Sequence, residues 1–282
     1  ILVRNGRAAG VRLASGEASE GKYVDDHLGS DPTSTNQTFT DNFSEKPIWI
    51  DLAYARYAPK AVKGLYVVAG KFANPFRSSD IIWDSDVNPE GAYAEYQLTA
   101  LGSFQPFVGV GYMLARETGS DHADTHLLAY VAGFDWQVAK DVKASFAATY
   151  YDWDNINEDI TAKHSASSSN LRGNTSGWAW DFEVLDLIAS VDWKMFDLPW
   201  SAYVEWAHNC QENDTTAGSE GQDNAYSVGL KVGKAKKAGT WEVGWKWAYI
   251  EPNAVVGYFT DSDFGHANRK GHKIGGAYAL TD

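Results

Sequence analysis

The stretch from residue 241 to residue 249 reads Trp241-Glu242-Val243-Gly244-Trp245-Lys246-Trp247-Ala248-Tyr249. Its odd positions are all aromatic or aliphatic, whereas its even positions are small or charged. This alternation predicts a β-strand, because successive side chains of a strand point to opposite faces. One face of the strand would be apolar, and the other would be compatible with water.

The same alternation recurs along the chain in segments of roughly ten residues, the length of a tilted strand that crosses a bilayer. It predicts twelve strands, at 8–15, 48–58, 65–72, 92–101, 104–115, 126–138, 142–152, 184–195, 200–209, 225–232, 240–250 and 272–280. No stretch approaches 18 consecutive apolar residues, so the sequence excludes a membrane-spanning helix. A membrane-spanning β-barrel stays possible.

The connections between these strands alternate between long and short. The long ones are 16–47, 73–91, 116–125, 153–183, 210–224 and 251–271, and the short ones are 59–64, 102–103, 139–141, 196–199 and 233–239. Outer-membrane barrels have short periplasmic turns and long external loops. We therefore expect one domain, residues 1–282, that folds as an all-β transmembrane antiparallel up-and-down barrel with all long connections at one end. The serine-rich tip at 165–170 should be exposed to solvent.

The charge balance and the cysteine content restrict the possible partners. The 282 residues include 24 Lys and Arg against 37 Asp and Glu, a net charge of −13. The longest basic cluster is Lys234, Lys236 and Lys237, which argues against a nucleic-acid partner. Because Cys210 is the only cysteine, the chain has no internal disulfide and no cysteine-rich zinc site.

Several stretches resemble the bacterial outer-membrane "putative porin" family. The most specific is Ala69-Gly70-Lys71-Phe72-Ala73-Asn74-Pro75-Phe76, and the others are 10–16, 31–38, 46–54, 83–91, 251–257 and 259–264. The resemblance implies a water-filled channel that passes ions and small hydrophilic solutes through the outer membrane of a Gram-negative bacterium. It also implies contacts with outer-membrane lipid and lipopolysaccharide, and a homotrimer of barrels with about sixteen strands each. Because no signal peptide or terminal aromatic residue is present, we expect the chain to be incomplete at both termini.

One long connection is the candidate pore constriction. Residues 73–91 include Phe76, Ile81, Ile82 and Trp83, whose exposure to external water would be unfavourable. We expect the connection to fold inward and to present its charged residues to the lumen, namely Arg77, Asp80, Asp84, Asp86 and Glu90. Packing against a neighbouring subunit is the alternative.

The strand positions whose side chains are expected to point into the barrel supply a second set of charged residues. The lumen-facing candidates are Arg12, Asp51, Glu95, Asp135, Lys143, Asp186, Asp192, Glu205, Lys231, Glu242 and Lys246. With Lys194 and Lys273 included, acids and bases on the wall nearly cancel, whereas the constriction carries an excess of acids. This predicts a modest cation preference. Inward glycines such as Gly109, Gly133, Gly229 and Gly244 would leave room for water.

Two spacings resemble metal sites. Asp84, Asp86, Asn88, Glu90 and Glu95 follow an EF-hand-like pattern, but Pro89 stands where that loop needs glycine. His122, Asp124 and His126 lie in a polar stretch without an element to fix them. We expect pore-lining acids and solvated histidines, and thus no metal and no cofactor.

The remaining alternatives belong to other functional classes. An enzyme is disfavoured because the chain contains no G-x-S-x-G motif. A structural or adhesive outer-membrane barrel with partner-binding loops would need bulky residues to fill the interior. A soluble β-sandwich binding protein would bury its Trp-rich faces in a core.

Overall fold

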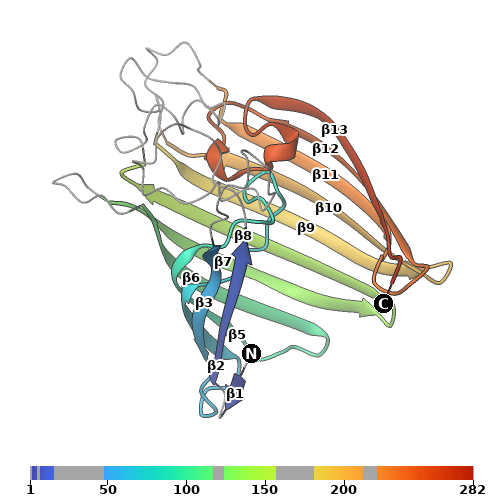
Figure 1. Cartoon of the computed structure of the whole chain (residues 1–282), viewed down its shortest axis with the longest axis horizontal. Helices are drawn as coiled ribbons and strands as arrows, with labels where there is room; N and C mark the ends of the chain where they lie inside the picture. The colour runs from blue at the N-terminus through green and yellow to red at the C-terminus, as the bar shows by residue number, and fades with distance from the viewer. Residues whose placement is uncertain are drawn as a thin grey trace.

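The structure is a computed structural model that describes residues 2–4, 7–15, 48–116, 124–156, 181–211 and 221–281, with side chains from residue 50 onward. Thirteen strands form one antiparallel sheet in which each strand pairs with its neighbours in the sequence (Figure 1). They are β1 (Leu2–Arg4), β2 (Arg7–Ser15), β3 (Ile48–Tyr57), β4 (Leu65–Lys71), β5 (Glu90–Gln97), β6 (Phe104–Arg116), β7 (Thr125–Ala139), β8 (Val142–Asp154), β9 (Glu183–Met195), β10 (Leu198–Asn209), β11 (Asn224–Gly233), β12 (Trp241–Ile250) and β13 (Arg269–Tyr278).

The all-β, up-and-down antiparallel fold is confirmed, and the twelve predicted segments correspond to β2 through β13. The short strand β1 is additional. β5 ends at Gln97 rather than at residue 101, because 98–103 forms a turn closed by the bridge between Leu101 and Phe104. Gly102, at φ +65°, supplies the left-handed backbone that this turn requires.

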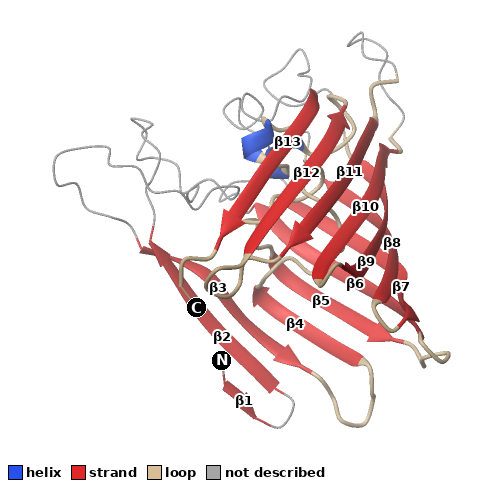
Figure 2. Cartoon of the chain, turned by 90° about the vertical axis from the view of Figure 1, so that its right-hand side faces the viewer, coloured by secondary structure: helices blue, strands red, loops and turns tan. Residues whose placement is uncertain are grey.

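The sheet curls into an open trough (Figure 2). Among the described residues no pairing joins β13 to β1 or β2, so this part of the chain does not show the closed barrel expected from the sequence. The only helical elements in the described ranges are two 3₁₀ turns, η2 (Gly257–Phe259) and η3 (Ser262–Phe264). None of the described helices is long and apolar enough to cross a membrane.

Long and short connections lie at opposite ends of the strands, as the sequence predicts. Since consecutive strands are antiparallel neighbours, all the long connections begin at the same end of the sheet, namely 16–47, 72–89, 117–124, 155–182, 210–223 and 251–268 (Figure 2). The short turns lie at the opposite strand ends, namely 58–64, 98–103, 140–141, 196–197 and 234–240. The tip at 165–170 lies outside the described residues.

The two faces of the sheet differ in what they expose. The convex face presents large apolar side chains to the surroundings, among them Val110, Tyr112, Tyr130, Trp136, Val204, Trp241 and Trp245. The concave face contains the buried residues, including Leu127, Tyr151 and Val184. A soluble sandwich would bury its apolar face, whereas a lipid-facing surface exposes it. The convex face therefore has the character of a membrane-facing wall.

Candidate channel interior

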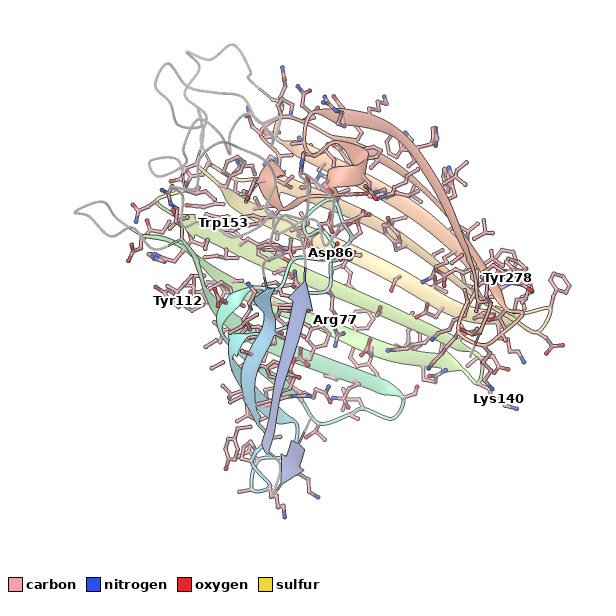
Figure 3. The ribbon with its side chains drawn as sticks, viewed as in Figure 1. Arg77, Asp86, Tyr112, Lys140, Trp153 and Tyr278 are labelled. Atoms are coloured by element: carbon pink, nitrogen blue, oxygen red, sulfur yellow. The ribbon has the colours of Figure 1, made fainter. Side chains whose placement is uncertain are left out.

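The connection 72–89 lies against the concave face. The Phe76 ring packs edge-on against Tyr93 of β5 and Tyr151 of β8, with centroids 5.8 and 5.2 Å apart. Ile81 is completely buried, and the Trp83 ring lies 6.0 Å from the Trp153 ring of β8. Figure 3 shows Arg77 and Asp86 of this connection over the middle of the sheet. The apolar side chains thus attach the connection to the inner wall.

Polar contacts fix the same connection to distant strands. The Ser79 backbone N–H donates to Glu205 Oε1 of β10 at 2.8 Å, and the Ser79 hydroxyl donates to the other carboxylate oxygen. The Arg77 guanidinium lies 3.5 Å from the Phe107 ring centroid and 3.3 Å from Asp135 of β7. The connection therefore spans the trough from β4 and β5 to β10.

A second connection, 251–268, also folds inward and packs on the first. The Asp84 N–H donates to the Phe259 carbonyl at 2.7 Å, and the Asp261 N–H donates to the Asp80 carbonyl at 3.0 Å. The Phe259 ring lies 5.3 Å from Trp83 and 5.4 Å from Trp153. Sequence reasoning missed this element, although Val255, Val256, Tyr258 and Phe259 carry the same apolar signal that was used for 73–91.

A network of ion pairs joins the two connections to β12 and β13. Lys246 Nζ lies 2.8 Å from Asp80 and 2.9 Å from Asp261, and Lys273 Nζ lies 2.8 Å from Asp261. Burial favours the neutral acid, but hydrogen bonds from Lys273 and Lys246 outweigh it and lower the pKa of Asp261 to about 2. Burial raises the pKa of Asp80 despite the adjacent Lys246.

The five candidate constriction residues have different surroundings. Arg77 and Asp80 are held in the ion pairs described above. Asp84 accepts hydrogen bonds from the N–H groups of Asp86 and Ser262, and burial raises its pKa. Asp86 is half-buried, and Glu90 begins β5 and is exposed.

Most of the candidate lumen-facing residues share the concave face. The strand registers align Glu95, Asp135, Lys143, Asp186, Asp192, Glu205, Lys231, Glu242 and Lys246 on it. Near the short turns, Lys143, Asp192, Lys194, Lys231 and Glu242 line a cavity of about 530 Å³. Lys140, labelled in Figure 3, lies in the β7–β8 turn at the same end of the sheet. The Arg12 side chain lies outside the described residues.

Asp51 reaches the interior through a backbone irregularity. Arg12 pairs with Leu52 and Leu13 pairs with Ile50, so Asp51 is the extra residue of a β-bulge. It is 5% exposed, whereas the adjacent Ile50 is 52% exposed. The Asn88 amide donates to Asp51 Oδ1 at 2.8 Å, which ties the connection 72–89 to β3.

The expectation that inward glycines leave room for water is wrong for most of them. The rings of Tyr93, Phe107 and Tyr203 lie directly over Gly109, Gly133 and Gly229, respectively, where an added Cβ would meet them. Aromatic rings from neighbouring strands commonly cover glycines in sheets. Gly244 has no such cover. The glycines therefore accommodate flat rings against the wall.

The EF-hand-like spacing does not converge in space, and only part of the histidine spacing lies in the described ranges. Asp84 faces Ser262, Asn88 faces Asp51, and Glu95 accepts from the Tyr93 hydroxyl at 3.0 Å. His126 lies 3.0 Å from Asp154, and His122 is outside the described ranges. Within those ranges, no three His, Cys, Asp or Glu side chains cluster as metal ligands.

An antiparallel meander with an apolar convex face, a charged concave face and inward-folded long connections defines the class of outer-membrane β-barrel proteins. The chain belongs to the family described as "Putative porin", whose model matches residues 2–176 and 156–282. This confirms the resemblance found in the sequence and places the protein in the outer membrane.

Comparison with individual proteins adds two similar folds. The anion-selective porin from Comamonas acidovorans is 11% identical, with a TM-score of 0.41 over 82% of this chain and 56% of that one. A loop L8 deletion mutant of OmpT, an outer membrane protein of Vibrio cholerae, is 12% identical, with a TM-score of 0.40 over 86% and 69%. This chain thus spans little more than half the length of the first. A search of curated proteins found no match.

Proposed function

We propose that the protein is a passive diffusion channel for ions and small hydrophilic solutes, with a modest preference for cations and no catalytic chemistry. The observation that carries the proposal is the attachment of two long connections, 72–89 and 251–268, to the concave face. Inward-folded connections narrow the passage through a barrel and bring charged side chains close to the passing solute. Trimer formation and lipopolysaccharide contacts remain predictions.

The charged residues around the two inward-folded connections support the cation preference. Arg77, Lys246 and Lys273 each lie within 3.3 Å of a carboxylate, so their positive charge is compensated locally. Asp84 and Glu95 instead accept hydrogen bonds from neutral donors, a backbone N–H and a tyrosine hydroxyl. Neutral donors stabilise a carboxylate without cancelling its charge. A surplus of negative charge at the narrow level attracts cations.

Reversal potentials in a salt gradient across a planar bilayer test the preference. We expect the wild-type reversal potential to have the sign of a cation-selective channel. Its size should fall toward zero at high salt, because the screening length decreases to about 3 Å at 1 M. The double variant Asp84→Asn, Asp86→Asn should shift the potential toward neutrality.

Asp197→Asn is the matched control, because Asp197 lies in the β9–β10 turn with its side chain 97% exposed. This variant should retain the wild-type potential. An anion-selective wild-type channel would contradict the proposed preference, and a folded protein that passes no current would contradict the channel itself.

A further inference from the structure

Two buried carboxyl groups face each other on the concave wall beneath the connection 72–89. Asp186 of β9 is fully buried, and Glu205 of β10 is 4% exposed. Asp186 pairs in register with Ala207, so Glu205 occupies the diagonal position on the same face. On the other side Asp186 pairs with Thr149 of β8, which is also fully buried.

The polar atoms around this pair are incompletely satisfied. Both carboxylate oxygens of Asp186, the Thr149 hydroxyl and the Tyr151 hydroxyl make no hydrogen bond within the described part of the chain. Neither Asp186 nor Glu205 forms a salt bridge there, and the nearest loop contact to Glu205 comes from Ser79. Buried polar atoms without partners are rare, and buried charges are normally paired or bound to a metal ion. Two adjacent buried acids with unpartnered oxygens are therefore a candidate cation site.

We propose that Asp186 and Glu205 bind one calcium ion, with the hydroxyl oxygens of Thr149 and Ser79 completing the ligand set. The available donors are all oxygens, which favours a hard cation over zinc or copper. Two carboxylates supply two negative charges, which one divalent ion neutralises. Calcium accepts irregular sets of six to eight oxygens, whereas magnesium requires near-octahedral geometry and retains several waters. This site is separate from the EF-hand-like spacing at 84–95.

The ion would join three strands and one connection. Thr149, Asp186 and Glu205 come from the adjacent strands β8, β9 and β10, and Ser79 comes from the connection 72–89. Bound calcium would thus fasten that connection to the wall. The competing occupant of the pair is a single shared proton, and the experiment below distinguishes the two.

Terbium luminescence tests the site directly. The full chain, folded in detergent micelles and freed of metal by a chelator, is titrated with Tb³⁺ as a calcium probe while its aromatic residues are excited. Tyr151 lies at the site and its ring centroid is 5.9 Å from that of Trp83, so both can sensitise the bound ion. We expect emission that saturates at one Tb³⁺ per chain and that Ca²⁺ displaces.

Variants assign the emission to these residues. Asp186→Asn should weaken Tb³⁺ binding by about tenfold or more, because even supporting residues of metal sites contribute this much. Asp192→Asn is the matched control, because Asp192 lies on the same strand and face near the short turns and should bind Tb³⁺ like the wild type. If Asp186→Asn does not fold, Glu205→Gln replaces it with the same expectation.

Three outcomes would overturn the proposal. The first is a folded wild type without saturable emission at neutral pH, which is the behaviour of a carboxyl pair that shares a proton. The second is equal binding by the wild type and the folded Asp186→Asn or Glu205→Gln variant. The third is loss of binding in Asp192→Asn, which would place the ion elsewhere. Because binding is measured in micelles without a current, failure here is distinct from failure of the channel proposal.

Discussion

Lys246 is the residue on which the interior ion pairs converge. Its side chain is 10% exposed and contacts both Asp80 and Asp261. Replacing it by methionine would leave two carboxylates beside an empty position, and breaking a buried pair in this way costs about 3 kcal/mol. We expect Lys246→Met to lower the unfolding free energy by about that amount, measured by denaturant unfolding in micelles.

The matched control for this prediction is Lys231→Met. Lys231 occupies the same face, but its side chain is 53% exposed and lies 3.7 Å from Glu242. An exposed pair of this kind contributes about 1 kcal/mol or less. Equal losses in the two variants would show that the network around Lys246 is not buried in the membrane-embedded protein.

Asp261 should make the stability of the protein sensitive to strong acid. Its pKa is lowered to about 2 in the folded protein, against about 3.9 in an unfolded chain. Its contribution is therefore fully present above about pH 4 and is lost as the pH falls through about 2. Melting temperatures should decline less steeply over this window in Asp261→Asn than in the wild type. The exposed neighbour provides the control, since Asp263→Asn should decline as the wild type does.

At the scale of the element, the connection 72–89 is expected to limit the current. Removal of residues 77–86 would take away the Arg77, Ser79 and Asp80 attachments together with the Trp83 ring. We expect single-channel conductance to rise, since less material would then occupy the trough. Circular dichroism must show unchanged strand content for the comparison to hold. An unaltered conductance in the folded variant would mean that the connection lies outside the path of the ions.

The elements themselves illustrate what the sequence can predict. Strands such as β12 follow from alternation alone, because a bilayer on one side and water on the other impose a period of two. The bulge at Asp51 and the early end of β5 depend on backbone geometry that alternation does not record. Alternation also does not predict the packing of the connection 251–268 onto the connection 72–89. This packing joins residues such as Asp84 and Phe259, whose proximity depends on the curl of the whole sheet.

For the molecule as a whole, the native cysteine offers a test of orientation. Cys210 is free and exposed, and it begins the connection 210–223 at the strand ends that carry the long connections. We expect a maleimide too bulky for the channel to label Cys210 on intact cells. In a Cys210→Ser background, Lys140→Cys at a short turn should react only after the outer membrane is opened. The reverse labelling pattern would mean that the short turns, and not the long connections, face the outside of the cell.

The rings that cover inward glycines affect how this interior can change during evolution. A substitution of Gly229 by alanine would displace the Tyr203 ring toward the passage, whereas replacement of Tyr93 by a small residue would uncover the backbone at Gly109. Either step alters the free cross-section through a side chain and leaves the strand registry in place. Single codon changes can therefore widen or narrow the free cross-section of the interior without redesign of the strands that form its wall.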